Sequence, residues 1–202
     1  MRVSLLLKDR ADAHSTMRHT GKVAKNVMKV SVATDRLTFT PLTDADLPVL
    51  HDWLGREHVS RWWGPQRSLE EVIRDYHPAQ RCFGGAMFFF IRLDDEPLGF
   101  IQGYAPIEHH HEGWWLDIDD PGIRGVDVFI ASKSHLDHGL GTSAVRAFVD
   151  RLFDDPQVTE VIADPAPDNL RAIHCFRNAG FVARQVVKTP DGPALLMTCP
   201  RS

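Results

Sequence analysis

The sequence predicts a mixed α/β fold of the α+β kind, in which one central, mostly antiparallel sheet is flanked by helices. Three observations support this. Strand-like and helix-like segments follow one another in the order β-α-α-α-β-β-β-α-β-α-β-β, which differs from the regular alternation of a doubly wound sheet. A glycine-marked junction at residues 139–141 joins a strand to a helix. The 202 residues, 43% of them hydrophobic, suffice for one sizeable core.

The first part of the chain reads as a strand and three helices. Leu37 and Phe39 alternate with polar residues over 36–41, as in a strand. A helix follows, with Thr43 and Asp44 as candidate caps, and a short helix is expected at 56–63. Ser68 opens a third helix through a capping box. Its expected apolar stripe comprises Leu69, Val72, Ile73 and Tyr76.

The second part alternates strands with two more helices. Strands are expected at 86–93, 98–105, 125–131, 158–163, 181–188 and 194–199, and helices after Gly139 and over 169–179. Residues 94–97 form a turn, and residues 108–121 form a loop rich in acids, histidine and tryptophan. Within the first of these strands, Phe88 and Phe90 face one side and Phe89 the other.

Charge is divided unevenly along the chain. Residues 1–29 hold seven Lys or Arg against two Asp, whereas the remainder holds 16 basic and 25 acidic residues. We interpret residues 1–30 as a basic, flexible extension and residues 31–202 as one domain. The acidic domain disfavours a nucleic-acid partner, since phosphate recognition needs Lys and Arg.

Composition also bears on location. The chain contains no apolar run near the roughly 18 residues of a membrane span. Its three cysteines are widely spaced, which fits reduced thiols better than a disulfide framework. We therefore expect a cytoplasmic protein without a membrane partner, either a monomer or a homodimer.

The glycine-marked junction reads Leu136-Asp137-His138-Gly139-Leu140-Gly141-Thr142. Small residues at a helix N-terminus let backbone amides approach a pyrophosphate. Further along, Asn169 opens a helix that closes with Ala179-Gly180-Phe181. Together these segments resemble the GCN5-related N-acetyltransferase (GNAT) superfamily. Leu136 stands where the superfamily usually has Arg or Gln.

A narrower resemblance is to aminoglycoside 6′-N-acetyltransferases. It is carried, in order, by Trp62-Trp63-Gly64, Gly113-Trp114-Trp115, Asp120-Pro121-Gly122-Ile123-Arg124-Gly125-Val126-Asp127 and Thr189-Pro190-Asp191-Gly192-Pro193-Ala194. It runs from about Leu37 to Met197. The resemblance implies a GNAT-like fold whose sheet splays between its fourth and fifth strands.

The resemblance also implies that acetyl-CoA is the co-substrate and that no metal is needed. The residues that it implies for acetyl-CoA binding are Phe129, Ile130, Leu136, Asp137, His138, Gly139, Leu140, Gly141, Thr142 and Asn169.

Asp127 occupies the position where the family places a carboxylate beside the reacting amine. It is the candidate catalytic residue, as base or proton relay; alternatively, it only binds an ammonium or hydroxyl group. Asp164 closes the next strand, as a substrate-binding residue or as a turn carboxylate. Trp63, Glu112 and Trp115 complete the substrate-binding set, because a polycationic sugar suits acids and flat aromatic rings. In the alternative interpretation, the tryptophans are core residues and the acids are solvated.

Two features limit the chemistry. The run His109-His110-His111 is interpreted as a solvated loop, since consecutive residues rarely converge on one metal ion. Phe176 stands where many superfamily members have a tyrosine thought to protonate the leaving thiolate. Phenylalanine cannot donate a proton, and the adjacent Cys175 is interpreted as packing. The sequence therefore indicates no general acid.

The leading hypothesis is acetyl-CoA-dependent acetylation of the 6′-amine of aminoglycosides, which confers resistance. A second hypothesis is an acetyltransferase for another amine, such as a siderophore lysine or a protein N-terminus. A third is a non-catalytic acyl-CoA-binding module, which the departures from the superfamily pattern at Leu136 and Phe176 would favour. The acidic loop at 108–120 favours the first.

Overall fold

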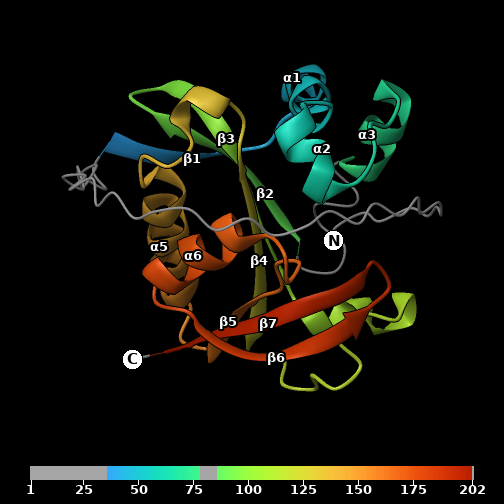
Figure 1. The fold of residues 1–202 in the computed structure, drawn as a ribbon, viewed down its shortest axis with the longest axis vertical. Coiled ribbons are helices and arrows are strands. Elements are labelled where there is room, and N and C mark those ends of the chain that lie inside the picture. The colour runs from blue at the N-terminus through green and yellow to red at the C-terminus, as the bar shows by residue number, and fades with distance from the viewer. Residues whose placement is uncertain (1–35, 78–85, 202) are drawn as a thin grey trace, which may run out of the picture.

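A computed structural model describes residues 36–77 and 86–201. The described strands form one sheet in the order β1-β2-β3-β4-β5-β7-β6 (Figure 1). They are β1 (Leu37–Pro41), β2 (Met87–Leu93), β3 (Glu96–Tyr104), β4 (Ile123–Ile130), β5 (Glu160–Ala163), β6 (Val182–Thr189) and β7 (Gly192–Pro200). The α-helices are α1 (Leu47–Leu54), α2 (Glu57–Trp63), α3 (Leu69–Asp75), α5 (Leu140–Phe153) and α6 (Leu170–Asn178). Short 3₁₀ helices are η2 (Asp44–Asp46), η3 (Pro106–Glu112) and η4 (Lys133–His135).

This order of elements confirms the expected fold class. The proposed N-terminal extension and Cys82 lie outside the described residues.

The sheet opens between β4 and β5. Neighbouring strands pair antiparallel except β4 and β5, which run parallel. That parallel pairing covers only Ile123–Gly125 against Glu160–Ile162, while β4 continues to Ile130 paired with β3 alone. The predicted splay between the fourth and fifth strands is therefore present. It leaves one backbone edge of β4 beyond Gly125 without a strand partner in the described part of the chain.

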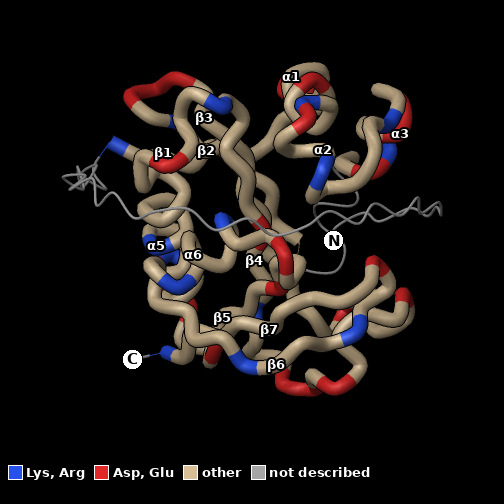
Figure 2. The backbone as a smooth tube through the Cα atoms, viewed as in Figure 1, with Lys and Arg blue, Asp and Glu red and all other residues tan. Residues whose placement is uncertain are grey.

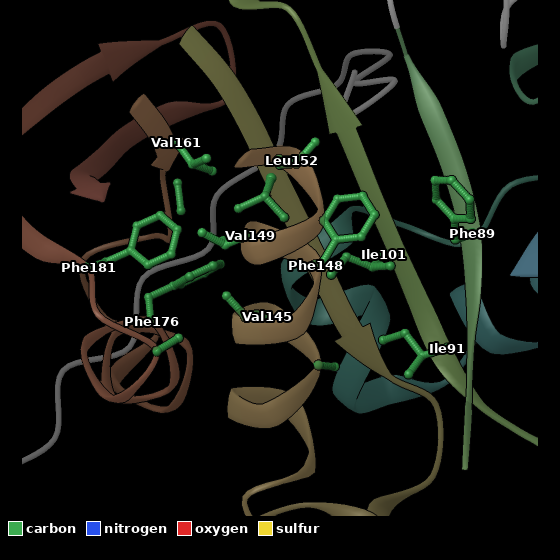
Figure 3. Close-up of a cluster of buried hydrophobic side chains, with 14 of the residues drawn as sticks. Phe89, Ile91, Ile101, Val145, Phe148, Val149, Leu152, Val161, Phe176 and Phe181 are labelled. Carbon is green, nitrogen blue, oxygen red and sulfur yellow. The ribbon is translucent and has the colours of Figure 1, made fainter. Parts of the chain in front are cut away.

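Two hydrophobic clusters cover the opposite faces of the sheet. One packs α5 and α6 on residues such as Ile101 and Val126, with Phe148 near its centre (Figure 3). The other packs α1, α2 and α3 on the opposite face, with Trp53 and Phe100 among its members. Figure 1 shows these two groups of helices on either side of β2, β3 and β4. Because side chains alternate along a strand, each central strand contributes to both clusters.

Gly125 marks the last paired residue of β4 before the opening. A Cβ atom there would lie 2.2 Å from the ring of Tyr104, so the position accepts only glycine. The Tyr104 ring thus lies directly over β4 at the point where the sheet divides. Tyr104 is the last residue of β3 and η3 begins at Pro106, so η3 starts beside the opening of the sheet.

Some expected boundaries and faces are wrong. β3 begins at Glu96, because Asp94 and Asp95 adopt positive φ and form the two-residue hairpin turn themselves. The capping box of α3 is present, but Leu69 and Ile73 are exposed and only Val72 and Tyr76 of the expected stripe are buried.

Candidate active site

Asp127 is held on β4 beyond the opening of the sheet. Its side chain is only 6% exposed, and its carboxylate accepts a 2.8 Å hydrogen bond from the Gln102 side-chain amide. The two residues are direct partners across β3 and β4. Strand alternation places Asp127 on the same face as Phe129, toward α1–α3. The buried carboxylate is thus fixed in orientation by a neighbouring strand.

The charge of Asp127 influences two other side chains. Burial raises the pKa of Tyr76 to about 12, and the carboxylate adds to that rise. Burial lowers the pKa of His109 to about 4, an effect that Asp127 opposes. The Asp127 charge therefore raises both pKa values, that of Tyr76 at the end of α3 and that of His109 in η3. The hydroxyl stays protonated and the imidazole stays neutral at pH 7.

Aromatic side chains line the same face. Trp63, at the end of α2, makes edge contacts with Phe100 and Phe129 at centroid distances of 5.9 and 5.0 Å. Trp115 is half-buried and packs against the same cluster, whereas Trp114 is buried. Trp114 is thus the core member of this pair, and Trp115 is the one left partly exposed. Trp63 and Trp115 are each partly exposed.

Glu112 ends η3, and its side chain is 28% exposed. One of its oxygens lies 3.7 Å from His109 Nδ1 and the other lies 3.5 Å from His111 Nε2. Figure 2 shows the acidic positions that follow one another along the segment from η3 to β4. The expected loop therefore begins as a 3₁₀ helix that directs Glu112 between two imidazoles.

The interpretation of the histidine run as solvated is wrong for His109. This side chain is only 6% exposed, and its ring packs edge-on against Tyr104 at 5.6 Å. His111 is exposed, as expected. The cause is the 3₁₀ helix, in which successive side chains point in different directions. The solvated loop that was expected would instead have left all three histidines in water.

Asp164 lies directly after β5 and is 2% exposed. It stands two residues beyond Ile162, the last β5 residue paired with β4, and Asp127 stands two residues beyond Gly125. Both carboxylates therefore follow the point where the strands separate. The burial of Asp164 argues against the alternative in which this carboxylate belongs to a simple surface turn.

The two predicted cofactor residues at the end of β4 have buried side chains in different clusters, Phe129 toward α1–α3 and Ile130 toward α5. The Ile130 carbonyl accepts a hydrogen bond from His58 at 3.1 Å.

The glycine-marked loop has the geometry of an anion site. Asp137 and Gly139 have φ angles of +64° and +79°, and Gly139 caps the 14-residue helix α5. The first-turn amides of an α-helix have no intrahelical acceptor and carry the positive end of the helix dipole. His138 and Gly139 are exposed, whereas Leu140 is buried and Leu136 packs on the core. Gly141 and Thr142 lie in the first turn, against Cys175 of α6.

A cavity of about 380 Å³ opens between α2, η4 and the start of α6. Asn169 lines it, and its side-chain oxygen caps α6 through Ala172 N at 3.2 Å. Three cations, Arg61, Lys133 and Arg171, line the same cavity together with the acids Glu57 and Asp168. Lys133 pairs with Glu57 at 2.9 Å. Arg171 also pairs with Asp137 of the glycine-marked loop at 3.0 and 3.2 Å. The loop and the cavity are thus linked by one ion pair.

Phe176 is buried and packs edge-on against Phe181 at 5.2 Å. Burial raises the pKa of the neighbouring Cys175 thiol to about 11, which keeps it protonated at pH 7. Both residues belong to the packing between α5, α6 and the sheet.

Sequence reasoning missed Gln102, His109 and the three basic residues of the cavity. Gln102 could have been found, because it is a polar residue in the otherwise apolar run of β3. The basic residues lie on three separate segments, so no local pattern connects them. Among the described residues, no group of three or more His, Cys, Asp or Glu side chains could hold a metal ion. No helix in the same residues is long and apolar enough to cross a membrane.

Comparison with known proteins agrees with this geometry. A family model described as an acetyltransferase (GNAT) domain matches residues 43–189. An aminoglycoside N(6′)-acetyltransferase type 1 of Klebsiella pneumoniae is 41% identical over 177 residues, covering 85% of this chain and 88% of the relative. A kanamycin resistance protein of Rhizobium radiobacter is 54% identical over 84 residues, covering 42% of this chain and 78% of the relative.

Solved structures agree as well. AAC(6′)-Ib in complex with paromomycin and acetyl-CoA superposes with a TM-score of 0.80 and 42% identity, over 83% of this chain and 94% of that one. AAC(6′)-Ib with coenzyme A and kanamycin gives a TM-score of 0.79 and 41% identity, over 82% and 95%. From the family match and these similarities, the chain belongs to the GNAT acetyltransferases.

Proposed function

We propose that this protein transfers the acetyl group of acetyl-CoA to the 6′-amino group of aminoglycosides and thereby confers resistance to them. The observation that carries the proposal is the buried Asp127, fixed by Gln102 at the opening of the sheet, on the face whose cluster also packs the half-buried Trp63 and Trp115. The similarity to aminoglycoside N(6′)-acetyltransferases over 85% of the chain supports the same substrate class.

The acceptor is a polycation, and the proposed site offers it carboxylates and aromatic faces. Glu112 is accessible enough to pair with an ammonium group, and Asp164 is a second, buried carboxylate near the opening. The tryptophan rings can stack on the apolar faces of the sugar rings. These groups would orient the acceptor so that its 6′-amine reaches Asp127.

The proposed reaction is a direct transfer. Asp127 accepts a proton from the 6′-ammonium group, and the free amine attacks the thioester carbonyl carbon. A C–N bond forms, the C–S bond breaks, and the thiolate of coenzyme A leaves with the electron pair. The nitrogen loses its second proton as the amide forms, and water carries a proton to the thiolate, since Phe176 has none to give. Asp127 then releases its proton to solvent. Backbone amides on the open edge of β4 would polarise the carbonyl.

The donor substrate would bind along the other side of the opening. The first-turn amides of α5 suit its pyrophosphate, and the exposed loop at Gly139 lets a phosphate approach the backbone. The Asn169 amide and the cations of the 380 Å³ cavity suit its remaining polar groups. We further propose that the protein acts in the cytoplasm as a monomer or homodimer, without nucleic-acid or membrane partners.

Release of the coenzyme A thiol tests this proposal. Purified protein is incubated with acetyl-CoA and either kanamycin or its 6′-hydroxyl analogue. Turnover with kanamycin and none with the analogue is expected, because only kanamycin carries the 6′-amine. Turnover with a siderophore lysine or a peptide N-terminus, but not with kanamycin, would instead favour an acetyltransferase for another amine.

A further inference from the structure

His109 combines burial with unused hydrogen-bonding capacity. It is 6% exposed, yet neither ring nitrogen makes a hydrogen bond within the described residues. Its ring lies edge-on to Tyr104 at 5.6 Å, and Nδ1 lies 3.7 Å from a carboxylate oxygen of Glu112. Buried polar atoms are nearly always paired, so this exception calls for an explanation.

Packing alone does not explain the side chain. An aromatic hydrocarbon would fill the same space against Tyr104 without the cost of burying two ring nitrogens. Burial lowers the pKa of His109 to about 4, so at pH 7 the ring is neutral, with one N–H donor and one acceptor. A neutral donor beside a carboxylate can fix it without neutralising its charge.

Helix geometry sets the relation between His109 and Glu112. They stand three residues apart on η3, and side chains at that spacing eclipse each other in a 3₁₀ helix. The 3.7 Å separation is slightly longer than a hydrogen bond, so a small side-chain rotation closes it. Gly113 then ends the helix in a left-handed conformation and leads to Trp114 and Trp115. Along the chain, Glu112 therefore lies between the buried His109 and the Trp114-Trp115 pair.

We propose that His109 is a positioning residue for the acceptor substrate: its Nδ1–H donates to Glu112 and orients that carboxylate toward an ammonium group of the aminoglycoside. The inference rests on the proposed function and extends it to a residue without a direct place in the reaction. Glu112 keeps its full charge for the substrate, and the buried imidazole gains the partner that it lacks in the free protein.

Three substitutions test the donor position. In His109→Asn the amide nitrogen stands near the position of Nδ1, whereas in His109→Gln it stands near Nε2. His109→Phe keeps the ring and removes both nitrogens. We expect His109→Gln and His109→Phe to raise the KM for kanamycin about tenfold, while the KM for acetyl-CoA stays within about twofold. His109→Asn should remain within about threefold of wild type for both substrates.

Two controls separate positioning from packing. His111→Asn alters the exposed histidine on the other oxygen of Glu112 and should change the KM for kanamycin less than about twofold. In a Glu112→Gln background, His109→Gln should have no further effect, because the partner carboxylate is gone. Thermal unfolding of each variant shows that it is folded.

The outcomes are distinct. Equal KM values for the Asn and Gln variants, or an unchanged KM in His109→Phe, would overturn the role of His109 while leaving the proposed function intact. If wild-type protein neither acetylates kanamycin nor binds it by calorimetry, the proposed function fails and the role of His109 fails with it. Turnover by wild type together with rescue by asparagine alone supports both.

Discussion

The two faces of β3 and β4 carry different kinds of side chain, although both belong to the same two strands. Toward α5, Ile101 and Val126 join a cluster whose buried members are all apolar. Toward α1–α3, Gln102 and Asp127 form a buried polar pair beside Phe100. Both faces carry an apolar cluster, and the face toward α1–α3 also carries the groups suited to chemistry.

The difference shows how the fold accommodates a buried carboxylate. A buried polar group is costly unless it is hydrogen-bonded, and Asp127 has Gln102 for that purpose. The remaining cost is offset by apolar packing on the opposite face of the same strands, where Phe148 and Ile101 are fully buried. Substitutions on the two faces should therefore separate into losses of activity and losses of stability.

The largest expected effect on activity is that of Asp127→Asn. The amide keeps the shape of the carboxylate but cannot accept the ammonium proton, so we expect kcat to fall about 10²–10⁴-fold. The free energy of unfolding should change by less than about 1 kcal/mol, because a hydrogen bond with Gln102 can persist. Release of coenzyme A thiol and urea unfolding measure the two quantities. Asp150→Asn, on the exposed side of α5, is the matched control. Near-normal kcat in Asp127→Asn would remove this residue from proton transfer.

Phe148→Ala should produce the opposite pattern. Phe148 is 1% exposed and packs edge-on against Phe39 and Phe89 (Figure 3). Loss of a buried phenylalanine ring leaves a cavity, and we expect a destabilisation of about 3–5 kcal/mol by urea unfolding. The folded fraction should retain the KM values of wild type. Ile73→Ala, at an exposed position of α3, should cost less than about 1 kcal/mol. A selective change in substrate KM in Phe148→Ala would contradict the division between the faces.

Acidification should lower the free energy of unfolding through protonation of His109. In the folded protein, burial lowers the pKa of this imidazole from 6.5 to about 4. The unfolded chain therefore binds the proton more tightly, and stability falls as the pH drops through 6.5 toward 4. The full effect is at most roughly 3 kcal/mol. Urea unfolding at several pH values should show a shallower loss for His109→Phe than for wild type. Parallel curves would mean that His109 titrates like an exposed histidine.

Most of the fold could be predicted from local pattern. Alternation along β2 places Phe88 and Phe90 in one cluster and Phe89 in the other, as expected. The capping box at Ser68 and the cap at Asn169 are both present, because each depends on residues within one helical turn. The exposure of Leu69 and Ile73 could not be predicted, since it depends on which elements pack over α3.

The features of the candidate site likewise divide into those that the sequence could predict and those that depend on tertiary packing. The family resemblance predicted Asp127 as the candidate catalytic residue, whereas its hydrogen bond to Gln102 depends on the register of β3 against β4. The burial of His109 follows from η3 and its packing against Tyr104, which composition does not reveal. The link between Asp137 and Arg171 joins segments 34 residues apart and is equally invisible locally.

The smallest expected effect concerns the glycine-marked loop. Asp137 places a carboxylate beside the proposed pyrophosphate site and pairs with Arg171 through exposed side chains. Asp137→Gly removes that charge and releases Arg171, so the KM for acetyl-CoA should fall about two- to threefold at low salt. Glycine adopts the φ of +64° without strain, which stabilises the folded chain, but it also increases the conformational entropy of the unfolded chain. The two effects oppose each other, so the free energy of unfolding should change by less than about 0.5 kcal/mol. Asp137→Asn tolerates the same backbone and should reproduce the change in KM. A higher KM in both variants would show that the carboxylate holds Arg171 where the donor substrate needs it, and the ion pair would then belong to the binding site.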